Sequence, residues 1–294
     1  MTLDQLRIFI AVADREHLTQ AAEALHLTPS AVSASIHALE SRYGVHLFDR
    51  VGRRIELSQT GRMFLIEAKA THQSARLCEL TLIELGGLHR GTLTIQASQT
   101  IASYWLPPFL VAYRAAYPNV VLVLNEGNSA AVSKAILDGS ADLGFAEGAI
   151  EEAALTISPV AQDRMVVVGA PGHLLARKRK VSLRDLADAT WVLREKGSGT
   201  RSVFETALRA RAIDPEALRT VLELPTNEAA CVAVRSSSHL TVVSDLVARP
   251  HVEAGRLAHI AFEIGTRSFG LVRHRQRYRT KASEAFEALL PRTS

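Results

Sequence analysis

LTPSAVSASIHALE, residues 27–40, has the spacing of a helix but an unusual solvent side. Val32, Ile36 and Leu39 are four and three residues apart, so they share one helix face, which Tyr43 extends. The opposite face carries short side chains and one imidazole: Ser30, Ser33, Ala34 and His37. Exposed helix faces usually carry Glu, Lys, Gln and Arg, which form helices better than Ser. This composition is unusual for a helix face that only contacts solvent.

LTQAAEALHLTPSAVSASIHALESRYG, residues 18–44, is expected to form two helices joined by a short turn, and Thr19 can cap the first. The small residues of this first helix would let another helix cross closely: Ala21, Ala22 and Ala24. Thr28 and Pro29 predict the start of the next helix, because a hydroxyl N-cap is followed by proline at the first helical position. Gly44 ends it. Two helices joined by a tight turn form a helix-turn-helix, whose second helix enters the DNA major groove.

The short side chains then have a function, because a helix in a groove must bring its backbone close to the base edges. Serine hydroxyls donate to or accept from bases and phosphates. His37 lies one turn after Ser33 and can reach a phosphate or a base edge. The alternative is an ordinary exposed helix whose serines only face water.

The following stretch, VHLFDRVGRRIELSQTG (residues 45–61), predicts a β-hairpin. Two β-prone pieces, Val45–Phe48 and Ile55–Leu57, flank a turn that contains Gly52. After a helix-turn-helix such a hairpin is a wing, and its tip carries three arginines: Arg50, Arg53 and Arg54. Guanidinium groups at this place contact phosphates or enter the minor groove, whereas the alternative is a tip that is merely solvated.

LRIFIAVADREHLTQAAEALHLTPSAVSASIHALESRYGVHLFDRVGRRIELSQTG, residues 6–61, resembles the winged helix-turn-helix of LysR-type transcriptional regulators nearly position by position. The remaining chain is similar in length and layout. Many members carry arginine after the second serine of the recognition helix, where this chain has Ala34. The DNA sequence preferred by relatives is therefore not expected to apply to this chain. The resemblance assigns DNA binding to Thr19, Thr28, Pro29, Ser30, Ser33, Ala34, His37, Arg50, Arg53 and Arg54.

Ser58 to about Leu85 reads as one long helix, with a seven-residue repeat along one face. The repeat comprises Met63, Ile66, Ala70, Leu77 and Leu80, with Gln73 at the missing inner position. Pairing with a second copy of the chain covers this stripe, as the family's linker helix does; packing on its own domain is the alternative. GGLHRG, residues 86–91, is the expected hinge.

After Gly91, strand-like and helix-like segments alternate, which predicts an α/β domain with largely parallel strands. The expected strands are TLTIQA, VVLVLN, DLGFAE, RMVVVGA, WVL, VLEL and LTVVSD. The resemblance implies a multidomain chain: an all-α winged helix-turn-helix over 1–58, a linker helix and hinge over 59–90, and a two-lobed α/β effector domain over 91–294, similar to periplasmic binding proteins. Lobe I covers 91–161 and 267–294, and lobe II covers 162–266.

Three loops carry short polar side chains at expected helix starts, within ASQTIA, REKGSGTRS and LPTNEAA. Free N–H groups at helix N-termini suit a polar or anionic ligand, and ligands of open α/β sheets bind beyond the carboxyl ends of the strands. The family's effector pocket uses the matching loops, which assigns effector binding to Ser98, Gln99, Thr100, Ser198, Gly199, Thr200, Thr226 and Asn227, together with Glu147. Helix capping is the alternative for each loop. Glu147 opposes a bare anion unless Arg194 or Arg201 offsets its charge.

Composition sets the remaining limits. With 294 residues, a net charge of +4 and 47% hydrophobic residues, the chain resembles an ordinary globular protein of two or more domains. No apolar run approaches a membrane span, and the start lacks a basic leader, so we expect a cytoplasmic protein without a membrane contact. Cys78 and Cys231 fit no metal or redox spacing. The basic run RHRQRYRTK, residues 273–281, is expected to be a solvated surface, with a second DNA contact as the alternative.

We therefore expect a regulator that binds double-stranded DNA and senses a small molecule, with small anions among the candidates. The family implies a homodimer or homotetramer that contacts RNA polymerase, with neither cofactor nor metal. The alternative function is a metabolite-processing enzyme with an appended DNA-binding domain. Its motifs are weak, because GSGTRS lacks the third glycine of a dinucleotide loop and no phosphate loop or nucleophile elbow appears. A purely architectural DNA binder would not need two lobes.

Overall fold

The computed structural model describes residues 1–51, 54–85, 91–148 and 150–291, and for a few residues near the wing tip and the end of the long helix it describes the backbone alone. By its contacts the chain divides into two units. The first unit contains Met1–Leu88 and Asp138–Ser140, and the second contains His89–Leu137 and Ala141–Ser294.

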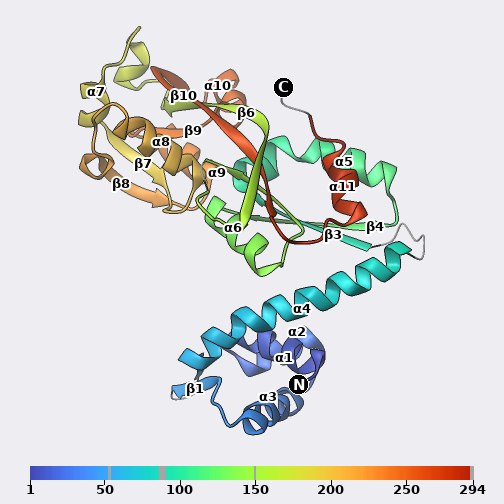
Figure 1. The fold of residues 1–294 in the computed structure, drawn as a ribbon. Coiled ribbons are helices and arrows are strands. Elements are labelled where there is room, and N and C mark those ends of the chain that lie inside the picture. Colours follow the sequence, from blue (N-terminus) through green and yellow to red (C-terminus); the bar gives the residue numbers. More distant parts are fainter. Residues whose placement is uncertain (52–53, 86–90, 149, 292–294) are drawn as a thin grey trace. The chain divides into compact units, whose positions relative to one another are not determined.

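The first unit is helical with a small hairpin (Figure 1). Its elements are α1 (Leu3–Ala13), α2 (Leu18–Leu25), α3 (Pro29–Tyr43), β1 (Phe48–Val51), β2 (Arg54–Leu57) and α4 (Gln59–Leu85). Phe9 lies at the centre of its core and contacts Phe48 and Phe64, with ring centroids 5.6 and 4.8 Å apart. Gly61 is required at the start of α4, because a Cβ there would lie 2.0 Å from the carbonyl oxygen of Leu47.

The predicted boundaries of α3 are confirmed. The Thr28 hydroxyl accepts a hydrogen bond from the backbone N–H of Ala31, Pro29 is the first helical residue, and Gly44 ends the helix with a φ of 66°. The N-cap predicted for α2 is wrong, because His17 caps that helix through Nδ1 and Thr19 lies inside it. An imidazole nitrogen accepts the N–H of Gln20, a role that we expected of a hydroxyl.

The hairpin forms, but its first strand begins later than predicted. The backbone N–H groups of Leu47 and Phe48 bond to the Glu40 carboxylate, so the Val45–Leu47 stretch is held by α3 and does not pair as a strand. β1 and β2 are antiparallel, with Phe48 opposite Leu57. The turn at Gly52 and Arg53 lies outside the described residues, as do the side chains of Arg50 and Arg54.

The second unit is a two-lobed α/β body (Figure 1). Lobe I contains β3 (Gly91–Ser98), the π-helix η1 (Ile101–Trp105), α5 (Pro107–Ala116), β4 (Val120–Gly127), α6 (Ser129–Asp138), β5 (Leu143–Glu147) and α11 (Lys281–Glu287). Lobe II contains the 3₁₀ helices η2 (Leu174–Arg177) and η3 (Pro215–Ala217), α7 (Leu183–Asp188), β7 (Thr190–Arg194), α8 (Gly199–Arg209), β8 (Arg219–Leu224), α9 (Asn227–Arg235), β9 (Thr241–Ser244) and α10 (Asp245–Glu253). Two long strands, β6 (Leu155–Gly169) and β10 (Ala258–His274), run through both lobes.

The six-stranded sheet of the second unit is mixed, which corrects the prediction of largely parallel strands. The larger sheet has the order β4-β3-β5-β10-β6-β9, and β7 pairs with β8. β3 is parallel to β4 and β5, and β7 is parallel to β8, whereas β10 is antiparallel to β5 and β6, and β6 is antiparallel to β9. The strand β10 and the first half of β6 were not predicted.

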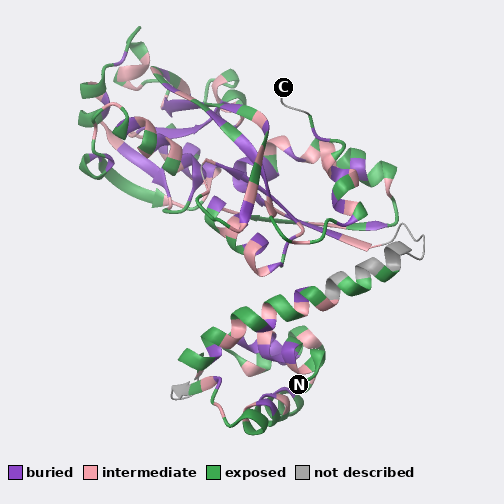
Figure 2. Ribbon diagram, in the orientation of Figure 1, coloured by how far each residue is buried: buried purple, intermediate pink, exposed green. Residues whose placement is uncertain are grey.

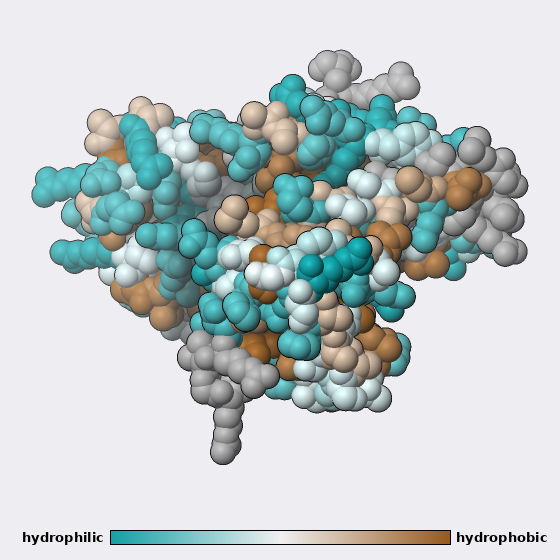
Figure 3. All heavy atoms as spheres, turned by 60° about the horizontal axis from the view of Figure 1, so that its bottom comes forward, coloured by the Kyte–Doolittle hydropathy of each residue, from teal (hydrophilic) through white to brown (hydrophobic). Residues whose placement is uncertain are grey.

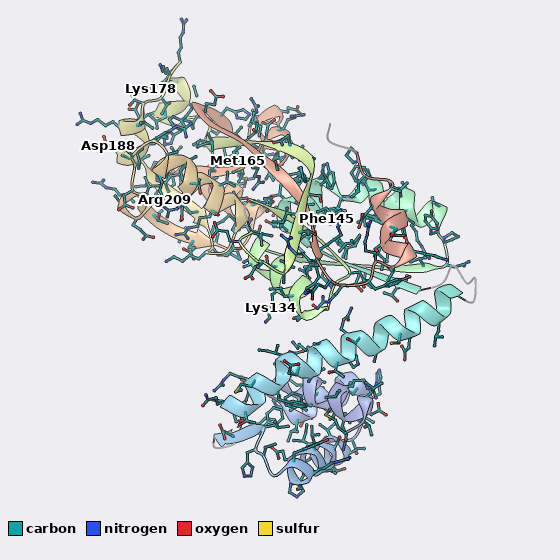
Figure 4. All side chains as sticks on the ribbon, in the orientation of Figure 1. Lys134, Phe145, Met165, Lys178, Asp188 and Arg209 are labelled. Atoms are coloured by element: carbon teal, nitrogen blue, oxygen red, sulfur yellow. The ribbon has the colours of Figure 1, made fainter. Side chains whose placement is uncertain are left out.

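Each lobe has its own hydrophobic core. Figure 2 shows buried residues in both halves of the α/β body. Phe145 lies in the core of lobe I, where Trp105, Phe269 and Phe286 surround it or pack nearby. Met165 lies in the core of lobe II, and Figure 4 shows the two labelled residues in separate parts of the body. In the described part of the chain the two lobes share only the strands β6 and β10, so polar side chains can lie between their cores.

Candidate DNA-binding face and interlobe cleft

The outer face of α3 is exposed, as its composition predicts. Val32, Ile36 and Leu39 are buried on the opposite face, whereas Tyr43 is exposed, which corrects its place in the buried row. The short residues of the outer face are all exposed: Ser30, Ser33, Ala34 and His37. Thr19 on α2 and both starting residues of α3, Thr28 and Pro29, are exposed as well. No side chain of this face is packed inside the described part of the first unit.

The three predicted ligand loops meet between the lobes. Gln99 and Thr100 come from the end of β3 in lobe I, and Asn227 comes from the start of α9 in lobe II. The backbone N–H of Asn227 donates to Gln99 Oε1 at 2.7 Å, and Asn227 Nδ2 donates to Thr100 Oγ1 at 3.1 Å. All three residues are buried. Gln99 and Asn227, which are 128 positions apart in the sequence, therefore belong to one polar cluster.

Helix capping does not account for this cluster as a whole. Thr100 precedes η1 and Ser198 precedes α8, but neither side chain makes a capping hydrogen bond. Thr226 does cap α9, because its hydroxyl accepts from the N–H of Ala229 at 3.0 Å. Thr226 is therefore a helix cap, whereas the hydroxyl groups of Thr100 and Ser198 do not cap the helices that they precede.

Arg194, at the end of β7, joins the cluster from lobe II. Its Nη1 donates to Gln99 Oε1 at 3.0 Å and to Asn227 Oδ1 at 2.9 Å, while Nε and Nη2 bond to the carboxylate of Glu195. Only 4% of its side chain is exposed. The guanidinium group therefore ties the two lobes together instead of facing solvent.

Arg267, on β10, is a second buried arginine that the sequence analysis missed. Its Nε donates to Asp163 Oδ2 at 2.7 Å, Nη1 donates to Thr200 Oγ1 at 3.0 Å, and Nη2 donates to Thr100 Oγ1 at 3.4 Å. Nη2 also lies 3.5 Å from Glu147 Oε1. Arg267, and neither Arg194 nor Arg201, therefore offsets the charge of Glu147, because Arg201 is paired with Glu205 and Glu223.

The carboxylates of this polar cluster are held in different ways. Burial raises the pKa of Asp163, an effect that Arg267 and the Ser244 hydroxyl oppose. Ser129 Oγ donates to the backbone carbonyl of Glu147 at 3.0 Å and lies 3.4 Å from its Oε2. Oε1 of Glu147 is buried without a hydrogen-bond partner among the described residues, and the same holds for Ser98 Oγ.

Next to this polar cluster, Glu228 connects α9 to lobe I. Its carboxylate accepts from Gln99 Nε2 at 2.6 Å and from the hydroxyl of Tyr104 in η1 at 2.9 Å. Burial and this carboxylate raise the pKa of Tyr104, and they raise the pKa of the neighbouring Cys231 to about 12. π-helical turns are frequent at functional sites, and this one carries a side chain that reaches the other lobe.

The basic run at residues 273–281 is part of the structure of lobe I, and not merely a solvated surface. Arg277 donates to the carbonyl oxygens of Ile136 and Leu137 at the end of α6. Three other arginines of the run also have partners: Arg273 and Arg279 pair with Glu287, and Arg275 donates to the Leu155 carbonyl. Arginine at a helix C-terminus satisfies free carbonyl groups and suits the helix dipole.

Two negative findings apply to the described residues. They contain no group of three His, Cys, Asp or Glu side chains placed to bind a metal ion. None of their helices has the length and apolar character that crossing a bilayer requires.

Two family models match the chain. The model described as bacterial regulatory helix-turn-helix protein, lysR family, matches residues 3–62, and the LysR substrate binding domain matches residues 86–293. The transcriptional regulator YeiE of Escherichia coli is 36% identical over 291 residues, which cover 97% of this chain and 96% of YeiE. The RuBisCO operon transcriptional regulator of Allochromatium vinosum is 33% identical over 263 residues, covering 90% and 86% of the two chains.

Solved structures share the fold. Full-length OxyR of Pseudomonas aeruginosa superposes with a TM-score of 0.72 at 21% identity, covering 98% of this chain and 94% of OxyR. CbnR in complex with its target DNA gives 0.68 at 20% identity and covers 99% of both chains. The regulatory domain of Synechocystis CcmR, solved with 2-PG, gives 0.62 at 24% identity and covers 68% of this chain and 96% of that domain. The chain belongs to the LysR family of DNA-binding transcriptional regulators.

Proposed function

We propose that the outer face of α3 reads DNA in the major groove while the wing contacts the backbone or the minor groove, and that a small effector binds between the lobes. The proposal of DNA binding rests on the outer face of α3, which carries short side chains. Ser30, Ser33 and His37 are exposed there and do not belong to the hydrophobic core of the first unit. The structure of CbnR with its target DNA shows that a protein of this fold binds a duplex.

One observation supports the effector site most strongly: Thr100 and Gln99 of lobe I are joined to Asn227 and Arg194 of lobe II by direct buried hydrogen bonds. A ligand that enters here must replace some of these bonds, so it acts on the angle between the lobes. A ligand changes that equilibrium only by its difference in affinity for the two arrangements, typically ~1–3 kcal/mol. The regulatory domain of CcmR, which has this fold, was solved in complex with 2-PG.

The chain is expected to act as a homodimer or homotetramer, because the predicted stripe of α4 begins with exposed apolar residues. Met63 and Ile66 are 67% and 70% exposed within one chain. Figure 3 shows hydrophobic residues among hydrophilic ones on one face of the molecule. We further propose that the protein consists of a DNA-binding domain over 1–58, a linker helix and hinge over 59–90 and an effector domain over 91–294. In this proposal it acts in the cytoplasm, contacts RNA polymerase and has no catalytic activity of its own.

The test uses the full-length protein and operators selected from a random duplex library. Ser33→Arg places a long side chain where the backbone should approach the bases, so we expect at least about fivefold weaker operator binding by fluorescence anisotropy. Ser41→Arg adds the same charge on the last turn of α3 and serves as the matched control, because recognition helices contact bases through their N-terminal residues. Equal affinities of the two variants would contradict the assignment of this face to DNA.

A further inference from the structure

The carboxylate of Glu147 lies close to the first residue of α8. A Cβ added to Gly199, the first residue of α8, would lie 2.6 Å from the Glu147 carbonyl oxygen and 2.9 Å from its Oε2. Helix N-termini attract negative charge, so Glu147 takes a position that an anionic ligand would otherwise use. Glycine is needed at 199 for this close approach.

One oxygen of this carboxylate lacks a hydrogen bond. Glu147 is 3% exposed, and its Oε1 accepts no hydrogen bond from the described residues. The nearest cation, Arg267, lies 3.5 Å away and directs its donors to Asp163, Thr200 and Thr100. A buried acceptor without a donor is costly, so a ligand that donates a hydrogen bond here is favoured.

The surrounding charges do not favour an anion that offers only acceptor oxygens. Both arginines of the cleft already have carboxylate partners, Arg194 with Glu195 and Arg267 with Asp163. Glu147 and Glu228 then remain as two further carboxylates. A ligand that brings only negative charge and acceptor oxygens meets a set of groups that is negative overall.

We propose that Glu147 makes the interlobe cleft selective for a small acid that keeps an O–H group, such as hydrogen phosphate or a hydroxycarboxylate. The O–H group donates to Oε1 of Glu147, while the hydroxyl and amide groups of Thr100, Thr200 and Asn227 bind the acidic oxygens. An ionised carboxylate only accepts hydrogen bonds, so an acid without a donor places two acceptors against each other and is excluded. This inference rests on the proposed function, in which the effector binds between the lobes.

The experiment compares matched anions on the full-length protein by isothermal titration calorimetry in a slightly alkaline buffer. Hydrogen phosphate is paired with sulfate, and glycolate with acetate, because the members of each pair differ in the presence of an O–H group. We expect at least one donor-bearing acid to bind about tenfold or more tightly than its partner. Glu147→Gln should remove the preference, because its amide also offers a donor to sulfate or acetate.

Glu287→Gln is the matched control, since Glu287 of α11 is another carboxylate with one buried oxygen that lacks a hydrogen bond, outside the cleft. It should keep the wild-type preference. Equal affinities within both pairs, or no binding of either donor-bearing acid, would overturn the inference. The proposed function is tested separately with Thr100→Val: loss of binding in this variant locates the ligand in the cleft even when the preference is absent, whereas unchanged binding contradicts the cleft itself.

Discussion

Asp163 and Arg267 lie opposite each other on β6 and β10, the two strands that run through both lobes, and form a buried ion pair. The same guanidinium group reaches Thr200 in lobe II and Thr100 in lobe I. The arginine is thus bonded to both lobes at the point where the chain crosses between them.

Replacing Arg267 with methionine should destabilise the effector domain strongly. Arg267→Met leaves Asp163 and Glu147 buried without their cation, and removing one partner of a buried pair costs about 3–5 kcal/mol. Differential scanning fluorimetry should show a Tm lower by about 6 °C or more for a domain of this size. Arg164→Met is the control, because Arg164 is next to Asp163 on β6 but its side chain is 64% exposed, and exposed pairs contribute roughly 0–1 kcal/mol. A similar fall in Tm for both variants would show that burial of the pair is not the cause.

Arg277 should matter for the stability of lobe I and not for DNA binding. Arg277→Ala removes the donors that satisfy the carbonyl groups of Ile136 and Leu137, and hydrogen bonds to charged groups contribute about 1.5–3 kcal/mol. We expect a lower Tm with unchanged operator affinity in anisotropy titrations. Lys134→Ala removes the same charge from the exposed side of α6, labelled in Figure 4, and should change neither quantity. Weaker DNA binding by Arg277→Ala alone would instead support a DNA contact for the basic run.

Cys231 should be an unreactive thiol. Burial, with a contribution from Glu228, raises its pKa to about 12, so the folded protein keeps it protonated between neutral pH and about pH 11. The thiolate is the reactive form, and an ordinary thiol gains it near pH 8.5. Iodoacetamide labelling followed by mass spectrometry should therefore stay slow at Cys231 from pH 7 to pH 10, and rise to the normal rate in guanidinium chloride. Cys78 is exposed and is the internal reference. Labelling of Cys231 as fast as that of Cys78 in the folded protein would contradict the raised pKa of Cys231.

The fold was predictable where its signals are local. Thr28, Pro29 and Gly44 set the ends of α3 through contacts within a few residues, so the sequence predicted them correctly. Tyr43 was placed wrongly, because the helical repeat continues to the last residue of α3 while the core beneath it does not. The cap of α2 was missed, because imidazole seldom takes this role.

The long strands were missed for a different reason. The paired residues of β6 and β10 are about 90 to 120 positions apart in the sequence. β10 also contains register shifts between Ile260 and Gly265 that interrupt the alternation of buried and exposed residues. Asp163 and Arg267 become neighbours only through this register, so no spacing in the sequence could reveal them. By contrast, Gln99, Thr100 and Asn227 could be expected to lie at the same edge of the domain, because each follows a strand that could be identified. Their role in effector binding stays a prediction.

The continuity of β6 and β10 limits how the effector domain can move. Their ladder of hydrogen bonds continues from Leu155–His274 at one end to Gly169–Ala258 at the other, so neither lobe can slide along the other without breaking many bonds at once. Bending and twisting of a two-stranded ribbon need only small changes in backbone angles, and the bulged stretch of β10 is the place where they are easiest. We therefore expect that ligand binding between the lobes changes their relative orientation by rotation about this ribbon.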